Sequence, residues 1–382
     1  MTNSFDTACM RRAVELARLG EGHVEPNPMV GAVIVSAGGE VVGEGFHERF
    51  GGPHAEVAGL AAAREAARGG TLYVTLEPCC HHGKTPPCTE AIMAAGIRRV
   101  VVAAGDPFEA VAGRGLDALR EAGLVVETGL CEEEALRLTA SYRMLVTHGR
   151  PWVIAKWAAS LDGVLAAPLG GERWISSPES RAIVHELRGR VDGILVGIGT
   201  ALADDPLLSA RPEGPRRAVR VVLDSTARLP LESQLVGTAR EWPVLVAVGP
   251  AADPGRVAAL EAAGCEVLPL VQASEGQRLA ALLQEAGRRR WTNLLVEGGA
   301  AVLETFFVEQ LVDEIWSFTA AKVFAASGRG VVAGDPTDSG VAAPRLPEPP
   351  PLIIEGVQHP GGDLFVRGLV RRDAPDERVW AH

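Results

Sequence analysis

One histidine, one glutamate and two cysteines are the residues of this sequence most suited to chemistry. His54 and Glu56 are separated by one residue, and Cys79 and Cys88 are separated by eight. An imidazole and two thiolates supply three zinc ligands and leave the fourth tetrahedral position open for water, as in a catalytic rather than a structural zinc site. Zinc lowers the pKa of such a water to about 7, and a carboxylate can then carry a proton to a departing amine. The pattern predicts a hydrolytic enzyme with one zinc ion per chain, bound by His54, Cys79 and Cys88.

These residues can meet only if the start of a helix and the end of a strand lie close together. Residues two apart on a helix do not share a lateral face, so His54 and Glu56 can serve one metal only from a helix end. A Gly-Gly-Pro sequence precedes the alanine-rich segment 55–67, which predicts a helix with the site in its first turn. The apolar, β-branched segment 72–76 predicts a strand leading to Cys79. We expect the two elements to converge on one cleft.

The pattern His-x-Glu, then Pro-Cys and a further Cys, resembles the signature of the zinc-dependent cytidine-deaminase superfamily. Two residues separate the cysteines in most of that superfamily, whereas here the longer loop contains His81-His-Gly-Lys-Thr-Pro-Pro87. This loop is similar to that of the deaminase half of the bifunctional riboflavin-biosynthesis deaminase/reductase family, and segments 27–31, 45–47, 106–107 and 111–115 also agree with that family. The resemblance implies that Glu56 is catalytic and that substrate is contacted by Asn27, His47 and Lys84.

Two glycine-containing turns in the second half suit a dinucleotide. The segment 191–206 contains a predicted strand that ends in Gly-x-Gly-Thr200, whose backbone amides and hydroxyl can bind a phosphate. This is not the Gly-x-Gly-x-x-Gly fingerprint, and an ordinary tight turn explains it equally well. A second turn, Glu297-Gly-Gly299, lies between another apolar strand and a predicted helix that begins near residue 300. Two such turns in one domain predict a dinucleotide site.

Together with segments 156–163, 173–178 and 202–206, these turns resemble the reductase half of the same family, whose fold is like that of dihydrofolate reductase. The resemblance implies contacts to NADPH from Ala158, Trp174, Thr200, Asp204, Ser225, Gly299, Ala300, Ala301, Val302, Leu303, Glu304 and Thr305. It implies contacts to the reductase substrate from Lys156, Glu172, Arg188, Leu208, Arg211 and Glu297. Arginines suit the phosphate of that substrate because one guanidinium can bind two oxygens at once.

The sequence departs from the family at two places in this half. Glu172 stands where relatives often have a serine. In segment 320–326, alanines replace a proline before Lys322 and one or two glycines after it. Alanine does not readily adopt positive φ, so the turn there must differ. An enzyme with a working deaminase and an altered reductase half therefore stays open as an alternative.

Helices and strands alternate along the chain, which predicts an α/β protein. In the first half we expect an α/β/α sandwich of the cytidine-deaminase type, with helices at 6–19, 55–67, 89–95 and 132–147 and strands at 30–35, 41–45, 72–76 and 100–104. A further helix and strand reach residue 129, and His148-Gly-Arg-Pro151 then breaks the pattern. We therefore predict a deaminase domain at 1–148 and a reductase domain at 149–382, the latter ending in a hairpin of segments 353–357 and 364–370.

Composition and charge restrict the partners. The chain has 382 residues, 47% of them hydrophobic, which is enough for two sizeable cores. Its net charge of -11 is poorly suited to a nucleic acid, and the sequence has no basic stripe with interleaved aromatic residues. It begins with no basic segment followed by an apolar core and has no run of about eighteen apolar residues, so we expect a cytoplasmic enzyme without a membrane partner. Cys80 is the one alternative zinc ligand, whereas buried hydrophobic positions are expected for Cys9, Cys131 and Cys265.

The resemblance as a whole implies a two-step catalyst of riboflavin synthesis. The deaminase half would hydrolyse the 2-amino group of 2,5-diamino-6-ribosylamino-4(3H)-pyrimidinone 5′-phosphate. The reductase half would use NADPH to reduce the ribosyl group to ribityl, giving 5-amino-6-ribitylamino-uracil 5′-phosphate. We expect this small phosphorylated pyrimidine as the partner, and a homodimer or homotetramer. The alternatives are a nucleic-acid-editing deaminase with an appended nucleotide-binding domain, and a non-catalytic nucleotide-binding protein with a structural zinc, which would not need Glu56.

Overall fold

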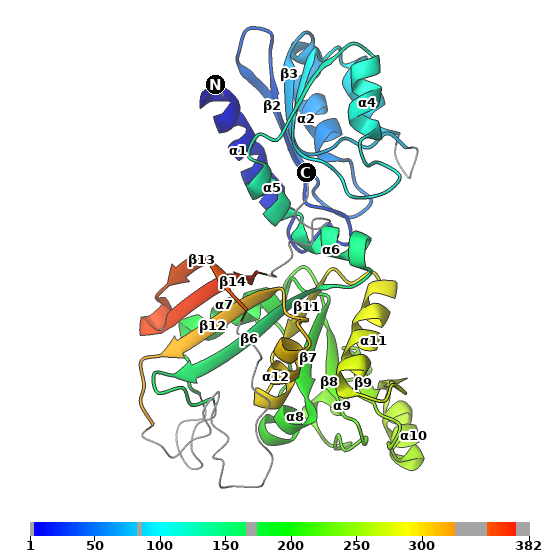
Figure 1. The fold of residues 1–382 in the computed structure, drawn as a ribbon, viewed down its shortest axis with the longest axis vertical. Coiled ribbons are helices and arrows are strands. Elements are labelled where there is room, and N and C mark those ends of the chain that lie inside the picture. Colours follow the sequence, from blue (N-terminus) through cyan, green and yellow to red (C-terminus); the bar gives the residue numbers. More distant parts are fainter. Residues whose placement is uncertain (1–3, 82–85, 166–173, 325–349, 372–382) are drawn as a thin grey trace. The chain divides into compact units, whose positions relative to one another are not determined.

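A computed structural model describes residues 4–81, 86–165, 174–324 and 350–371. The chain divides into two compact units, of which the first ends at Gly149 and the second begins at Arg150 (Figure 1). We call them the N-terminal and the C-terminal unit. Lys84, Glu172 and the end of the alanine-rich segment 320–326 lie outside the described residues.

The N-terminal unit contains one five-stranded sheet, in the order β2-β1-β3-β4-β5. Strand β1 is antiparallel to both of its neighbours, whereas β3, β4 and β5 are parallel to one another. Parallel strands require crossover connections, and helices provide them. The strands are β1 (Gly31–Val35), β2 (Val41–Phe46), β3 (Thr71–Leu76), β4 (Arg99–Ala104) and β5 (Val125–Thr128).

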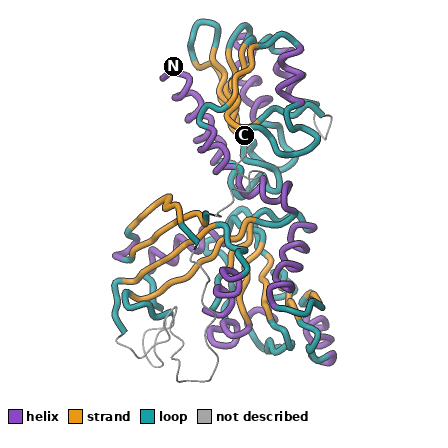
Figure 2. The backbone as a smooth tube through the Cα atoms, viewed as in Figure 1, coloured by secondary structure: helices purple, strands orange, loops and turns teal. Residues whose placement is uncertain are grey.

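Two hydrophobic cores lie on the opposite faces of this sheet, because successive side chains of a strand point to opposite sides. Ile34 and Leu72 belong to the core that contains residues of α2, α3 and α4. Val33 and Tyr73 belong to the core that contains residues of α1 and α5. Figure 2 shows the helices on both sides of the sheet, so the predicted α/β/α sandwich is confirmed. The helices are α1 (Ser4–Arg18), α2 (Ala55–Ala63), α3 (Cys88–Ala94), α4 (Arg114–Glu121), α5 (Glu132–Leu138) and α6 (Ala140–His148).

Two of the predicted helices differ from those observed. The single helix predicted at 132–147 is divided at Thr139 into α5 and α6. The Thr139 hydroxyl donates hydrogen bonds to the carbonyls of Ala135 (2.9 Å) and Leu136 (3.4 Å) and so competes with the helical backbone. The helix predicted at 55–67 ends as an α-helix at Ala63, because Arg64 has a positive φ of 51°, and continues as a 3-10 helix.

The C-terminal unit contains a nine-stranded sheet, in the order β10-β9-β8-β7-β11-β6-β12-β14-β13. The strands from β10 to β12 are parallel, and β14 and β13 continue the sheet as an antiparallel hairpin, as predicted. All residues of β7 and β9 are buried, as is usual for parallel strands that are covered on both faces. The strands are β6 (Trp152–Ser160), β7 (Gly193–Gly197), β8 (Val219–Leu223), β9 (Val244–Val248), β10 (Glu266–Pro269), β11 (Asn293–Val296), β12 (Glu314–Ala320), β13 (Leu352–Gln358) and β14 (Leu364–Val370).

Helices α11 and α12 supply Leu282 and Phe306 to a core that also contains Leu195 and Val221 of the sheet. Local sequence sets the start of several helices. Ser177 caps α7 by accepting a hydrogen bond from the Ser180 amide, with a proline at the first helical position. The helices of this unit are α7 (Pro178–Arg188), α8 (Ile198–Asp204), α9 (Gln234–Gly237), α10 (Pro254–Ala263), α11 (Glu275–Arg288) and α12 (Ala300–Val308).

Candidate active sites

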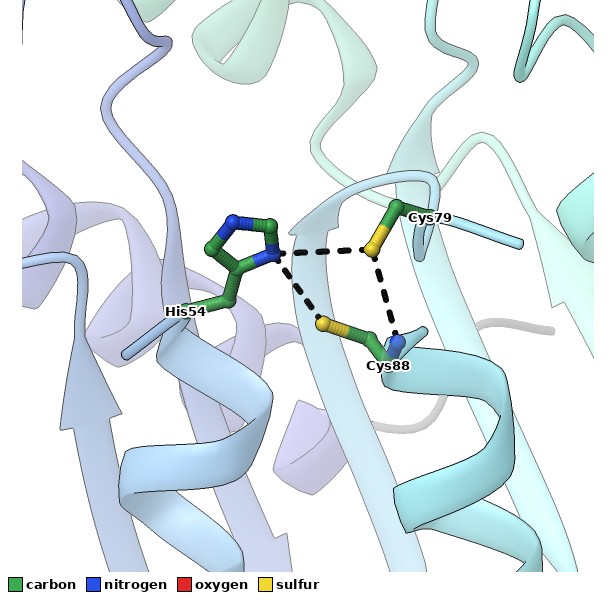
Figure 3. Close-up of side chains that lie close together, drawn as sticks. All are labelled: His54, Cys79 and Cys88. Carbon is green, nitrogen blue, oxygen red and sulfur yellow. Dashed lines mark hydrogen bonds between the residues drawn. The ribbon is translucent and has the colours of Figure 1, made fainter. Parts of the chain in front are cut away.

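His54, Cys79 and Cys88 lie together in the N-terminal unit, with their ligand atoms all within 4.8 Å of one another. His54 Nδ1 is 3.2 Å from Cys88 Sγ and 3.5 Å from Cys79 Sγ (Figure 3). The three side chains come from different elements. His54 is the residue that caps the start of α2, Cys88 is the first residue of α3, and Cys79 follows β3. Two helix starts and one strand end therefore meet at this point.

The spacing of these atoms fits zinc. Bond lengths of about 2.1 Å to nitrogen and about 2.3 Å to sulfur place the two ligand atoms about 3.6 Å apart in a tetrahedron. The observed separations of 3.2 and 3.5 Å are close to this value. One nitrogen and two sulfur ligands also match the preference of zinc, and they leave one coordination position for water or substrate.

The electrostatics of the two thiols also favour a cation. The hydrogen bond from Cys88 lowers the pKa of the Cys79 thiol to about 4, while the hydrogen bond to Cys79 and burial raise the pKa of Cys88. Two thiols this close share one negative charge, because a second thiolate would face the first. A divalent cation between them favours both thiolates. Such a pair is therefore suited to hold a metal.

Glu56 lies beside this cluster and is only 3% exposed. Its carboxyl contacts the Cys88 thiol. Burial raises the pKa of Glu56 to about 6, which is close to the range in which a carboxyl group can both accept and donate a proton near neutral pH. The first turn of α2 thus supplies both a potential metal ligand, at its cap, and a potential proton carrier.

Asn27 and His47 lie next to the cluster. The rings of His47 and His54 are 5.4 Å apart, edge to face. His47 Nδ1 is 2.9 Å from the Pro53 carbonyl oxygen, which can only accept, so Nδ1 carries the proton. Nε2 then accepts from the Asn27 side-chain amide at 3.3 Å. Burial lowers the pKa of His47, which keeps the ring neutral in this arrangement.

Cys80, the alternative ligand, is not part of the cluster and has its thiol 3.8 Å from the Ala110 carbonyl. The sequence analysis gave no role to two further acidic residues, Glu77 and Asp106, although Asp106 lies in one of the segments that agree with the family. The Glu77 carboxylate accepts hydrogen bonds from backbone amides that include Gly113 (3.0 Å) and Gly115 (2.9 Å). Burial raises the pKa of Asp106 to about 6, and its carboxyl accepts a hydrogen bond from the Tyr142 hydroxyl at 3.0 Å.

In the C-terminal unit, Glu297 joins two of the predicted substrate contacts. Its carboxylate accepts hydrogen bonds from Arg188 Nε (2.5 Å) and Nη2 (3.0 Å), and Lys156 Nζ lies 3.4 Å away. Burial would raise the pKa of Glu297, but the charges of Arg188 and Lys156 outweigh it and hold the pKa at about 2. The cluster thus carries one anion between two cations.

Leu208 and Arg211 lie on the loop after α8. The Leu208 side chain is buried, and its backbone has a positive φ of 53°. Arg211 is exposed, and its Nη2 lies 3.4 Å from His185 Nε2. Because Arg188 donates to the Ser209 carbonyl at 3.3 Å, this loop contacts the Glu297 cluster directly.

The two glycine turns lie side by side where the carboxyl ends of two central strands of the C-terminal sheet meet. Strands β7 and β11 are adjacent and parallel, so their carboxyl ends meet at the same edge. A Cβ atom built on Gly299 would lie 3.2 Å from Thr200 Oγ1, and one on Gly197 would clash with Val302 at 2.6 Å. A side chain at position 197 would therefore displace Val302, and one at position 299 would crowd the Thr200 hydroxyl.

The other predicted NADPH contacts lie at different points of this unit. Ala158 is half-buried on β6, and Asp204 is the last residue of α8. Ser225 follows β8, and its carbonyl accepts a hydrogen bond from the Gly249 amide at 3.0 Å. Trp174 is exposed, with the Arg181 guanidinium 4.9 Å above its ring. The start of α12 holds the remaining contacts, Gly299, Ala300, Ala301, Val302, Leu303, Glu304 and Thr305.

Known proteins resemble both halves of the chain. The family described as the cytidine and deoxycytidylate deaminase zinc-binding region matches residues 3–104, and the RibD C-terminal domain matches residues 151–348. The riboflavin biosynthesis protein RibD of Aquifex aeolicus is 41% identical over 336 residues, which cover 88% of this chain and 91% of the relative. Its counterpart in Escherichia coli is 36% identical over 384 residues, which cover 94% and 98%.

Solved structures give the same result. RibD of Acinetobacter baumannii has a TM-score of 0.81 at 34% identity and covers 96% of this chain and 99% of its own. A diaminohydroxyphosphoribosylaminopyrimidine deaminase/5-amino-6-(5-phosphoribosylamino)uracil reductase from Thermotoga maritima has a TM-score of 0.80 at 35% identity, with the same coverage.

A zinc-dependent deaminase fold and a reductase fold in one chain define a bifunctional enzyme that acts on a small molecule. Zinc and NADPH are its cofactors. The chain belongs to the family of bifunctional riboflavin-biosynthesis deaminase/reductases. Among the described residues, no helix has the length and apolar character needed to span a membrane.

Proposed function

We propose that the enzyme deaminates 2,5-diamino-6-ribosylamino-4(3H)-pyrimidinone 5′-phosphate and then reduces the ribosyl group of the product to ribityl. The observation that carries the first step is the His54, Cys79 and Cys88 cluster with the buried Glu56 carboxyl beside it. The second step is supported by the Glu297 cluster and by the adjacent glycine turns in the same unit. The Thermotoga maritima relative has a title that names both activities.

In the deaminase reaction, His54, Cys79 and Cys88 would hold zinc, which supplies a Lewis acid for the activation of water. Glu56 would accept a proton at a carboxylate oxygen and return it to the departing amino group, so that ammonia leaves. His47 and Asn27 would contact the pyrimidine ring beside the metal ligands. Lys84, in the loop between the two cysteines, would contact the substrate.

In the reductase reaction, NADPH supplies the hydride, and the protein orients the two partners. Thr200 and the start of α12 would bind the cofactor. Lys156 and Arg188 would bind the substrate, because Glu297 fixes both cations in place. Arg211 would contribute its guanidinium to the phosphate from the exposed loop.

Ammonia release tests the order of the two steps. The purified enzyme with the diaminopyrimidinone phosphate should release one ammonia per substrate without NADPH. NADPH should then be oxidised only after deamination, so that adding the deaminated intermediate removes the delay. If no ammonia appears, or if NADPH is oxidised before any ammonia is released, the proposed sequence is wrong.

The two activities should be separable, because each unit has its own sheet and its own core. We expect a fragment of residues 149–382 to reduce the supplied intermediate with NADPH in the presence of a zinc chelator. A fragment of residues 1–148 should bind zinc and release ammonia. A folded 149–382 fragment that oxidises NADPH only when the other fragment is added would contradict this prediction.

We further propose a homo-oligomer assembled through β13, and a cytoplasmic location. β13 is the last strand of the nine-stranded sheet, and its apolar side chains are exposed, including Ile354 at 51% and Val357 at 54%. Exposed apolar edge strands favour pairing with another chain. All six cysteines are free, as is usual in a reducing compartment.

Light scattering can test the proposed interface. Ile354→Lys should convert the dimer or tetramer into a smaller species, because the added charge would be buried between two copies. Leu231→Lys changes a residue of similar exposure (49%) elsewhere in the unit and should leave the mass unchanged. A wild-type enzyme that is monomeric at all concentrations would exclude the proposal.

A further inference from the structure

Arg220, on β8, is a buried arginine without an acidic partner among the described residues. Its side chain is among the largest that are fully buried, at 1% exposure. Burial lowers the pKa of its guanidinium to about 10, so the group is still a cation at neutral pH. Its hydrogen-bond partners are neutral: the carbonyls of Leu207 (3.2 Å), Thr238 (3.3 Å) and Trp242, and the Thr238 hydroxyl (2.7 Å).

Such a group is expensive for folding alone. Removing a charge from water is unfavourable, and among the described residues only neutral hydrogen-bond acceptors and the Trp242 ring, 5.7 Å away, offset this cost. An apolar side chain of similar volume would fill the same space without this cost. The retained charge therefore suggests a task that needs several donors in a fixed plane, which a guanidinium provides.

One of these donors reaches the turn 207–209, which the structure also holds from its other end. Arg220 Nη1 bonds to the Leu207 carbonyl, while the Ser209 carbonyl accepts from His185 Nδ1 (3.0 Å) and Arg188 Nη1 (3.3 Å). Leu208 lies between these two hydrogen-bonded carbonyls and has a φ of 53°, a conformation that a leucine adopts only at a cost in free energy. Such strain persists when the surrounding contacts fix the backbone.

Arg220 and the turn 207–209 also line one small pocket. Arg220, Ser209, Leu208 and Arg188 line it, and its volume is about 30 Å³. Arg220 Nε and Ser209 Oγ are buried and have no hydrogen-bond partner among the described atoms. The volume has room for about two waters, which could bridge these atoms and couple Arg220 to the turn further.

We propose that Arg220 is a positioning residue for the reductase reaction, which fixes the turn 207–209 so that Leu208 and Arg211 are presented to the substrate. This inference rests on the proposed substrate contacts of those two residues. Arg220 acts through the Leu207 carbonyl and not by touching the substrate. His185 carries the effect on to Arg211, because its Nδ1 contacts the Ser209 carbonyl and its Nε2 contacts Arg211.

Steady-state kinetics of Arg220→Met in the full-length enzyme tests this role. Methionine fills much of the same space but cannot hold the Leu207 carbonyl. We expect the KM for the deaminated intermediate to rise about tenfold, which corresponds to about 1.4 kcal/mol of binding free energy. The kcat, the Kd for NADPH and the rate of ammonia release should each stay within about twofold of the wild type. Arg220→Lys keeps the charge, so its KM should lie between the values of the wild type and of Arg220→Met.

Arg217→Met is the matched control, because Arg217 lines the same pocket but is exposed, and in the described part of the chain its one ion pair is with Glu213 at the surface. It should leave all these constants unchanged. An unchanged KM in folded Arg220→Met overturns the proposal. A rise in KM together with a similar loss of kcat and of NADPH affinity also overturns it, because that pattern indicates a general structural defect. If Arg220→Met does not fold, Arg220→Lys tests the proposal by the same measurements. Its KM should still exceed that of the wild type, because one ammonium group cannot reach all four acceptors.

Arg211→Met separates this inference from the proposed function. If Arg211→Met raises the KM for the intermediate and Arg220→Met does not, only the positioning role fails. If Arg211→Met has no effect, the proposed substrate contact itself is wrong.

Discussion

Replacing Glu56 by glutamine is expected to slow ammonia release about a hundred- to ten-thousand-fold, which is the usual contribution of a positioned proton carrier. Glutamine keeps the size of the side chain but cannot accept the proton. The zinc content should stay at one per chain, because His54, Cys79 and Cys88 remain in place. The reductase reaction, measured with the deaminated intermediate, should also be unchanged. Metal analysis and an ammonia assay on the same preparation measure both quantities.

Glu65→Gln is the control for this variant, since it makes the same chemical change at an exposed residue of the helical segment that follows the site. It should deaminate at the wild-type rate. Wild-type deamination by Glu56→Gln, or loss of its zinc, would show that the carboxyl has another role.

Replacing Glu297 by glutamine is expected to lower reductase activity about a hundredfold, as is typical when reacting groups are misplaced by about 1 Å. The carboxylate holds Arg188 and Lys156, whose side chains are only 14% and 17% exposed, and a neutral amide would leave these two cations facing each other. Breaking such a buried arrangement costs about 3–5 kcal/mol of unfolding free energy. We expect ammonia release from the full chain to be spared.

Acid should reproduce part of this loss of unfolding free energy in the wild type. The folded pKa of Glu297, about 2, lies below the usual value of about 4.3 for a glutamate. The stabilisation is therefore fully present above pH 4.3 and is lost as the pH falls from there towards 2. Thermal unfolding of the 149–382 fragment should show this loss, and it should be smaller in Glu297→Gln.

Glu266→Gln is the matched control for Glu297→Gln. Glu266 pairs with Arg289, but its side chain is 54% exposed, so Glu266→Gln should lower the free energy of unfolding by no more than about 1 kcal/mol. Equal reductase activity in Glu297→Gln and Glu266→Gln would contradict the proposed role of the buried cluster.

Local patterns in the sequence predicted the two-unit α/β architecture and most of the individual elements. The helix start after Pro53 and the apolar strand before Cys79 could be predicted because periodicity and turn residues depend only on neighbours a few positions away. The placement of a metal cluster at those ends follows from the same information. Thr139 shows the limit of such patterns, because its hydroxyl competes with the backbone inside a segment whose periodicity is continuous.

The tertiary structure decided the contacts between residues that are distant in the chain. Glu77 binds amides at the start of α4, more than thirty-five residues away, at Gly113 and Gly115, and Glu297 meets Lys156 across 141 positions. Nothing near Arg220 in the sequence indicates that it is buried with no acidic partner among the residues that the structure describes, or that it holds the turn 207–209. The residue types and local periodicity of this protein thus determined its chemistry and its elements. Only the order of the strands in the two sheets decided which side chains share a site, because strand order brings distant segments together and local sequence does not encode it.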